Sequence, residues 1–317
     1  MGGNKMELDR WKELNQEYAD FLEEYKLDSG HNVEWCKKPK PILYHYTTIN
    51  VLYNILSTGE LWATKYSYVN DKNEIEYGLE LLKERINLTS RYKEKLLGCI
   101  ESLKKQTLSD YYLLCFSSEK DSIPMWNYYG NQDGYNIGFS DEFFELFYMG
   151  NVEKSFSKIN LKKSKIFKKE TSGLGYSFES REMIYDRDFQ CKILDFIIKL
   201  TDKCLDNDET RPLWKLIFGI VSDHIIFMKS DVFEYEKEYR IAFKIEKKYK
   251  HCIHFRTSKG SLIPHLIIKS NIDEFIKEIN IGPFNKSDMA EGGLREFLDY
   301  KRLTEVPIYH SRLPNRF

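Results

Sequence analysis

The stretch Phe233-Glu-Tyr-Glu-Lys-Glu-Tyr-Arg240, followed by Ile241-Ala-Phe-Lys-Ile245, places charged residues at alternate positions. A β-strand has a side-chain period of two, so this alternation predicts a strand with one polar and one apolar face. Glu236, Glu238 and Arg240 would share the polar face. Two carboxylates and a guanidinium together form a candidate site, and the alternative is a solvated strand face with cross-strand ion pairs.

The composition is that of a globular chain with a large apolar core. Of the 317 residues, 42% are apolar and 15% aromatic, and 48 basic against 49 acidic residues give a formal net charge of −1. A balanced charge argues against attraction of the whole molecule to nucleic acid or membrane. The lysine run from Lys154 to Lys169 predicts a solvated loop or hairpin, and a contact with RNA, DNA or an acidic partner is the alternative.

The cysteines and the first residues indicate the compartment. The six cysteines have neither zinc-type spacing nor the density of a disulfide framework. The chain begins without the apolar core of a signal peptide, and no window of about 18 uncharged apolar residues is long enough to span a membrane. We therefore expect a cytoplasmic protein that makes no membrane contact.

Hydrophobic periodicity predicts two parts of unequal size. Residues 1–41 are predicted to form an amphipathic helix and a polar linker, and residues 42–317 a single α+β domain. Residues 141–228 have helical periodicity and are predicted to be a mainly helical insertion. Strands alternate with helices without regular βαβ spacing, which favours a mixed or antiparallel central sheet. The predicted strands cover residues 42–46, 61–64, 111–117, 135–139, 238–246, 253–256, 263–268, 275–281 and 306–309.

A second polar cluster lies on the first predicted strand, in Tyr44-His-Tyr-Thr47. If the two tyrosine rings face the core, His45 faces a cleft, and the alternative is a structural histidine with satisfied hydrogen bonds. Tyr66 and Tyr68 follow the next strand and offer a stacking wall for a flat ring. Ser117 ends an apolar central strand and offers a polar lining group.

Sequence motifs of several large enzyme classes do not occur in the chain. It has no Gly-x-x-x-x-Gly-Lys-Ser/Thr loop, no Gly-x-Gly-x-x-Gly fingerprint, no His-Glu-x-x-His helix and no Gly-x-Ser-x-Gly elbow. Phosphate-loop enzymes, Rossmann dehydrogenases, zinc proteases and serine hydrolases therefore have no support from the sequence.

The order of several short motifs resembles that of one known family. The motifs include Leu43-Tyr-His-Tyr-Thr47, Cys115-Phe-Ser117, Glu236-x-Glu238-x-Arg240 and Ile281-Gly-Pro283. Together they resemble a bacterial family known as the domain of unknown function numbered twenty-nine seventy-one, over about residues 42 to 310. That family name implies no activity.

A looser resemblance does imply an activity. His45 with Thr47, then a tyrosine among Tyr66, Tyr68 and Tyr77, then Glu238 occur in an order similar to that of ADP-ribosyltransferases of the diphtheria-toxin and poly-ADP-ribose-polymerase type. The resemblance implies an ADP-ribosyltransferase-like sheet. It also implies an enzyme that uses NAD as its substrate and needs no metal. Glu238 would stabilise the positive charge that develops on the ribose as nicotinamide leaves.

The same resemblance assigns roles to the other polar residues. Glu236 would orient or deprotonate the acceptor, and Arg240 would contact a phosphate or hold the two carboxylates apart in pKa. His45 would bind the adenosine-side ribose, with Thr47 and Ser117 also among the NAD-binding residues. Tyr66 or Tyr68 would stack on nicotinamide.

Three functions follow as expectations. The first is an NAD-dependent ADP-ribosyltransferase or NAD glycohydrolase, acting as a bacterial toxin or anti-phage effector. It would have a protein or nucleic-acid acceptor and a neutralising or sensor partner. The second is a metal-independent RNase that uses His45 and Glu238 and holds phosphates with the lysine run. The third is a non-catalytic module with aromatic residues around a ligand or partner pocket.

Overall fold

The chain divides into two compact units. The computed structural model describes residues 41–69, 72–106, 108–147, 176–206, 221–245, 247–258 and 260–314, and five residues before them: Glu13, Gln16, Glu17, Asp20 and Phe21. The helical unit comprises Met1–Lys37, Asn70–Ser109 and Ile184–Asp231, and the sheet unit comprises Lys38–Val69, Asp110–Met183 and Val232–Phe317. The Lys154–Lys169 run and most of the predicted N-terminal helix and linker lie outside the described residues.

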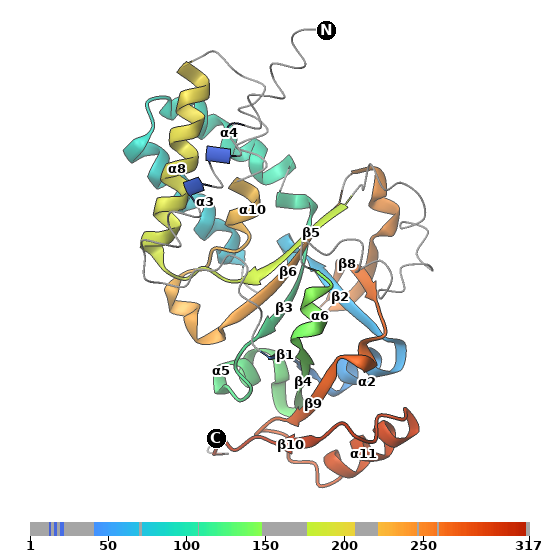
Figure 1. The fold of residues 1–317 in the computed structure, drawn as a ribbon. Coiled ribbons are helices and arrows are strands. Elements are labelled where there is room, and N and C mark those ends of the chain that lie inside the picture. The colour runs from blue at the N-terminus through green and yellow to red at the C-terminus, as the bar shows by residue number, and fades with distance from the viewer. Residues whose placement is uncertain are drawn as a thin grey trace. The chain divides into compact units, whose positions relative to one another are not determined.

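The sheet unit contains a ten-stranded, mostly antiparallel sheet (Figure 1). Its strands are β1 (Ile42–Thr48), β2 (Glu60–Lys65), β3 (Tyr111–Ser117), β4 (Gly134–Ser140), β5 (Tyr176–Glu182), β6 (Glu238–Ile245), β7 (His254–Ser258), β8 (Ser261–Lys269), β9 (Ile276–Ile281) and β10 (Ile308–His310). Its helices and helical turns include α2 (Ile49–Thr58), η1 (Tyr66–Tyr68), α5 (Ile123–Met125), α6 (Asp141–Glu145), η9 (Asp231–Glu236, which begins in the helical unit) and α11 (Ala290–Tyr300). Strands β9 and β10 pair in parallel and the other strand pairs are antiparallel.

The central strand β3 has three partners. Strand β6 pairs with it along its whole length, from Tyr111 to Ser117. A strand has only two edges, so β1 and β2 must share the other edge. Strand β1 pairs with β3 at Ser117, and β2 pairs with it at Tyr112 and Leu113. The sheet therefore splits beside residues 114–116 of β3, with β4 and β9 continuing from β1 and β8 and β7 continuing from β2.

The two faces of the sheet differ in character. Leu43, Phe116, Ile137 and Tyr239 belong to the large apolar core, and we call their side of the sheet the core face. Three phenylalanines of the segment Asp141–Phe147 also belong to this core, and the Phe116 ring lies 4.7 Å from the Phe144 ring. The alternate residues, including Ser117 and Glu238, occupy the opposite side, which we call the polar face.

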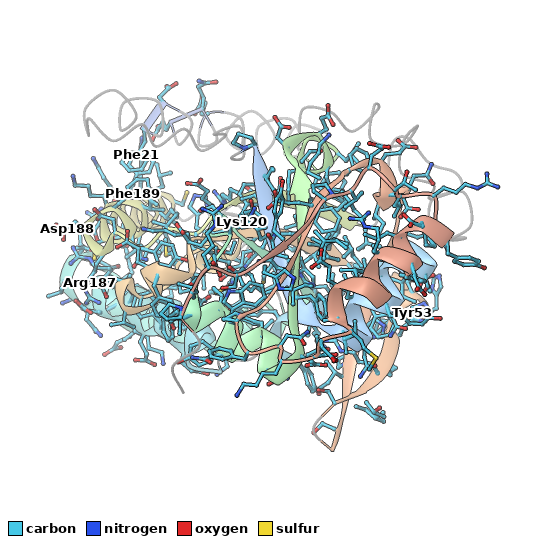
Figure 2. All side chains as sticks on the ribbon, turned by 90° about the horizontal axis from the view of Figure 1, so that it is seen from below. Phe21, Tyr53, Lys120, Arg187, Asp188 and Phe189 are labelled. Carbon is cyan, nitrogen blue, oxygen red and sulfur yellow. The ribbon has the colours of Figure 1, made fainter. Side chains whose placement is uncertain are left out.

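Helix α2 ends at a glycine. Gly59 caps it in the left-handed conformation, with φ 68°, and its N–H donates to Ile55 O at 2.9 Å. Glycine adopts this conformation without the steric cost that a Cβ imposes. On the exposed side of the same helix, the Tyr53 ring lies 5.3 Å from the Phe297 ring of α11 (Figure 2).

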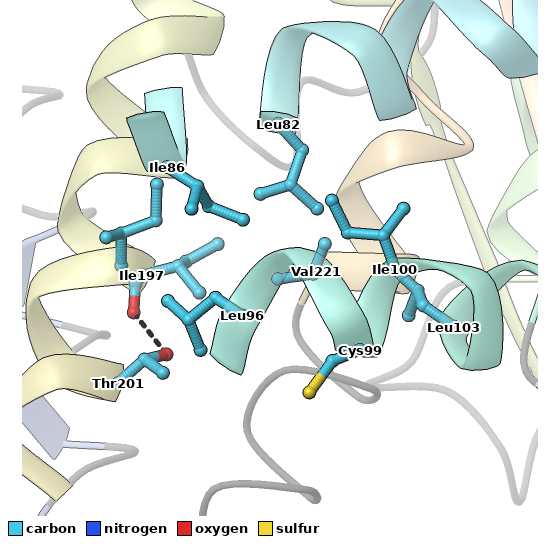
Figure 3. A pocket seen from close by; sticks show the side chains of 10 residues that line it. Leu82, Ile86, Leu96, Cys99, Ile100, Leu103, Ile197, Thr201 and Val221 are labelled. Atoms are coloured by element: carbon cyan, nitrogen blue, oxygen red, sulfur yellow. Dashed lines mark hydrogen bonds between the residues drawn. The ribbon is translucent and has the colours of Figure 1, made fainter. Parts of the chain in front are cut away.

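The helical unit is built from α3 (Lys72–Thr89), α4 (Lys93–Gln106), α8 (Arg187–Asp206) and α10 (Ser222–Ile225). The described residues of the predicted N-terminal helix contact α8: Phe21 stacks on Phe196 at 4.1 Å, and Glu17 pairs with Lys203 at 2.7 Å. Apolar side chains of α3, α4 and α8 enclose a cavity of about 20 Å³ (Figure 3). A space this small with apolar walls is a packing gap rather than a ligand site.

The predicted α+β class and mostly antiparallel sheet are confirmed. The helical unit, however, contains α3 and α4 in addition to the C-terminal part of the insertion predicted over residues 141–228. Strand β5 also lies within that insertion and pairs with β6. Its sequence, Tyr-Ser-Phe-Glu-Ser-Arg-Glu, is too polar to signal a strand by apolar alternation. None of the helices that the structure describes is long and apolar enough to cross a membrane.

Candidate functional site

Glu238 and Arg240 form a buried ion pair on the polar face of β6. Arg240 Nε and Nη2 both lie 2.8 Å from Glu238 Oε1. The exposed fractions of the two residues are 4% and 2%. Residues two apart on a strand share a face, which is why the sequence alternation locates this pair correctly. A charge-assisted pair at this depth fixes both side chains in one geometry.

Glu236 is not on the strand, which corrects the prediction of three charges in one row. It is the last residue of η9, and β6 begins at Glu238. Lys237 between them adopts the left-handed conformation with φ 41°, which breaks the alternation. Ser117 Oγ donates to Glu236 O at 2.6 Å, and Ser118 N donates to Lys237 O at 3.0 Å. The end of β3 therefore holds this turn through the backbone of the acidic motif.

A second buried guanidinium lies beside the pair. Arg181 on β5 is directly opposite Arg240 on β6, so both side chains are on the polar face. Arg181 Nη2 lies 3.3 Å from Glu179 Oε1. The polar face thus carries two arginines and two glutamates on adjacent strands. Only the Glu238–Arg240 pair on β6 was predicted from the sequence.

His45 lies at the split of the sheet. Its Nδ1 is 3.0 Å from Cys115 O, on the part of β3 that neither β1 nor β2 pairs with. A carbonyl only accepts, so Nδ1 carries the proton and Nε2 carries the lone pair. Burial lowers the pKa of His45, the hydrogen bond to Cys115 opposes this shift, and the nearby Arg256 charge adds to it. The imidazole is therefore neutral at pH 7 and presents an acceptor nitrogen.

The strand registers place His45 and Glu238 on opposite faces of the sheet. Tyr44 is opposite Ser117, and Ser117 is opposite Glu238, so these three side chains share the polar face. His45 follows Tyr44 on β1 and points to the core face, where its ring lies 5.6 Å from that of Phe116. The structure therefore brings Glu238, Arg240 and Ser117 together, and a ligand that touches His45 as well has to enter the split.

The other predicted binding residues lie apart from the ion pair. Thr47 shares the core face with His45 and is buried. Tyr66 is 2% exposed, so its ring is packed in the protein rather than presented as a stacking wall. Tyr68, on the same turn η1, is 46% exposed.

A cluster that sequence reasoning missed lies on the β2 side of the split. It consists of Trp62 and Thr64 on β2, Arg256 on β7 and His265 on β8. Arg256 Nη2 donates to Thr64 Oγ1 at 2.8 Å, although the two residues are 192 positions apart in sequence. The Trp62 ring stacks on the His265 ring at 4.5 Å. No sequence spacing could indicate these contacts, because they depend on the pairing of β2, β8 and β7.

The other described residues form no further strong candidate site. No group of three or more His, Cys, Asp and Glu side chains converges to hold a metal ion within the described ranges. The helical unit has a surface hollow of about 430 Å³ beside Arg187, which Figure 2 labels. There, Arg187 pairs with Glu84 at 2.7 Å, and Tyr77 donates to Gln190 at 2.6 Å. These polar groups are already engaged with one another.

The turn at Lys237 gives a stability prediction. Lys237→Gly and Lys237→Ala both remove the exposed ion pair with Glu234, but only glycine relieves the left-handed strain. We expect the glycine variant to have a free energy of unfolding about 0.5–1 kcal/mol higher than the alanine variant. Urea denaturation measures this difference. Equal stabilities, or a more stable alanine variant, would show that the turn does not hold the left-handed conformation.

The lowered pKa of His45 gives a pH prediction. Below its usual pKa of about 6.5 the unfolded chain binds the proton and the folded chain does not, so acid favours unfolding. The wild type should lose up to about 1 kcal/mol between pH ~7.5 and ~5.5 relative to His45→Gln, which keeps an N–H for Cys115 O. His265 is present in both proteins, so its contribution to the pH dependence of stability cancels in the comparison. Parallel stability curves for the two proteins would contradict the assignment.

Comparison with known proteins gives one match. Residues 125–241 match the sequence model of a family described as "Protein of unknown function (DUF2971)". The matched segment begins at Met125 and includes β4, β5 and the Glu238–Arg240 pair. No curated protein and no solved structure matches the chain. The segment that carries the buried ion pair is therefore similar to a family whose description assigns no activity.

Proposed function

We propose that this chain cleaves NAD at the nicotinamide–ribose bond, as an ADP-ribosyltransferase or an NAD glycohydrolase. The observation that carries the proposal is the buried Glu238–Arg240 pair on the polar face of β6. Positive charge develops on the ribose as nicotinamide departs, and a fixed carboxylate stabilises that charge. Resemblance to ADP-ribosyltransferases, in the order of His45, the tyrosines and Glu238, supports the choice of NAD.

The proposed reaction divides the work among three side chains. The bond between the anomeric carbon of ribose and the nicotinamide nitrogen breaks, and its electron pair leaves with nicotinamide. Water or an acceptor group then bonds to that carbon and releases a proton. Glu238 is held ready by the two bonds from Arg240 to its Oε1. Glu236 orients or deprotonates the acceptor, and His45 accepts a hydrogen bond from a ribose hydroxyl at Nε2.

The proposal makes a demand on the path of the ligand. Because His45 points to the core face and Glu238 to the polar face, one NAD molecule contacts both only by crossing the split beside residues 114–116 of β3. Strands β1 and β2 leave β3 at this point, so neither occupies its edge there. The split is therefore the place where the proposed substrate binds.

A second candidate function is a ligand-binding module without catalysis. The observation that favours it is the depth of the ion pair, since Glu238 is 4% exposed. A buried carboxylate that already accepts two bonds from one guanidinium stabilises a fold as readily as it serves a reaction. The RNase alternative needs the Lys154–Lys169 run, which lies outside the described residues, and no described contact favours it.

The biological setting belongs to the same proposal. Resemblance to toxins among the ADP-ribosyltransferases supports a cytoplasmic toxin or anti-phage effector. Its acceptor would be a protein or a nucleic acid, and a neutralising or sensor partner would hold it in check. Labelled NAD incubated with cell lysate identifies the acceptor, because transferred label remains on the protein or nucleic acid fraction.

Removing the carboxylate tests the proposed chemistry. We expect Glu238→Gln to lower the rate of NAD loss by at least about 100-fold, because the developing charge loses its partner. That substitution also takes the Glu238 carboxylate away from the buried Arg240 charge, which destabilises the fold. The double variant Glu238→Gln/Arg240→Gln removes both charges and keeps the side-chain volumes, so it separates loss of activity from loss of folding. Nicotinamide release, followed by chromatography, measures the rate.

Glu278 provides the matched control. It is also a largely buried glutamate on the sheet, on β9, and it pairs with Lys120 at 2.7 Å. Glu278→Gln should retain NAD turnover. Turnover that survives in the folded double variant would contradict the proposed role of Glu238. A wild-type chain that binds NAD without consuming it would favour the non-catalytic module.

A further inference from the structure

Arg256 is a partly buried cation without an acidic partner among the described residues. Its guanidinium donates to the neutral Thr64 hydroxyl at 2.8 Å. Burial lowers the pKa of Arg256, which reflects the cost of holding a charge away from water. The other buried arginines of the sheet each have a glutamate: Arg240 has Glu238 and Arg181 has Glu179. No Asp or Glu in the described ranges forms an ion pair with Arg256, so a bound anion would compensate a charge that these residues leave unmatched.

The described contacts of Arg256 are with the Thr64 hydroxyl and the Trp62 ring. The Trp62 ring lies 5.9 Å from the Arg256 guanidinium carbon and stacks on His265 at an interplanar angle of 28°. Burial lowers the pKa of His265, and Arg256 adds to this shift, so the imidazole beside Trp62 is uncharged at pH 7. Trp62 is nonetheless 37% exposed. An exposed indole beside a desolvated guanidinium is a surface on which a planar base stacks.

The cluster lies on the same face as the Glu238–Arg240 pair. Thr64 is opposite Leu113 on β3, and Leu113 is opposite Ala242 on β6, so all three side chains share the polar face. Arg240 is two residues from Ala242 along β6. At about 4.8 Å between strands and 3.4 Å per residue, Thr64 and Arg240 are roughly 12 Å apart between their Cα atoms. A single extended ligand can therefore reach both places.

We propose that Arg256, Thr64 and Trp62 bind a nucleotide, with a phosphate on the Arg256 guanidinium and the base stacked against Trp62. The planar fork of arginine matches the geometry of phosphate oxygens, and the Thr64 hydroxyl holds the fork in place. The choice of a nucleotide as the ligand rests on the proposed function. The proposed site concerns binding and not catalysis.

A structural role for Arg256 makes the opposite prediction about stability. If its contacts with Thr64 and Trp62 served only to hold the fold, Arg256→Gln would destabilise the protein. If the charge is held ready for a ligand, its removal relieves a desolvation cost, and the variant is at least as stable as the wild type without ligand. The thermal midpoint of the ligand-free protein therefore distinguishes the two roles before any ligand is added.

Calorimetric titration of the full chain tests the site with three probes: ADP, adenosine and inorganic pyrophosphate. We expect ADP to bind the wild type and Arg256→Gln to weaken ADP about ten- to hundredfold, because one charge-assisted contact is lost. Trp62→Leu should weaken ADP and adenosine but leave pyrophosphate unchanged. Lys269→Gln, which removes an exposed cation from neighbouring strand β8, is the matched control and should bind ADP as the wild type does.

Two results would overturn the site. One is absence of ADP binding to the folded wild type, and the other is equal ADP affinity in the wild type and Arg256→Gln. Should Arg256→Gln fail to fold, Arg256→Lys keeps the charge but not the fork, and we expect it to weaken ADP severalfold. Unchanged ADP affinity in that variant would also overturn the site. If ADP binds as expected while NAD stays intact, the proposed cleavage fails and the nucleotide site stands.

Discussion

The structure depends on how the two edges of β3 are used. Strand β6 takes one edge along its whole length, so β1 and β2 must divide the other, and neither pairs with residues 114–116 of β3. The backbone of β3 at the split needs another hydrogen-bond partner, since buried carbonyl groups are rarely left without one. His45 provides it for Cys115 O, and this contact fixes the orientation of the imidazole. One constraint on strand pairing thus produces both the split and the position of His45.

The same sheet carries charge at two places and compensates it differently. On β5 and β6 each buried arginine pairs with a glutamate of its own strand. On β7 the described contacts of the Arg256 charge are with a hydroxyl and an aromatic ring. Proteins hold such unmatched charges where binding compensates them, at a cost in stability. The proposed reaction and the proposed nucleotide site therefore use different properties of one face: a fixed carboxylate and an available cation.

Much of this arrangement is predictable from sequence where local rules apply. The apolar run Tyr111–Ser117 predicted the central strand, and the spacing of Glu238 and Arg240 predicted their common face. Glu236 was placed wrongly because lysine rarely adopts the left-handed conformation that Lys237 has. Arg256 was missed because its partners come from strands that meet only in the folded sheet, and no local pattern encodes a distant hydroxyl.

The most direct measurement is the crystal structure of the full chain with ADP-ribose. We predict that the phosphates lie within hydrogen-bond distance of the Arg256 guanidinium and that the adenine lies against Trp62. The terminal ribose should lie on the polar face, directed toward Glu238. A ligand bound to the helical unit alone, or one that contacts neither Arg256 nor Trp62, would contradict the claim that the polar face of this sheet binds a nucleotide.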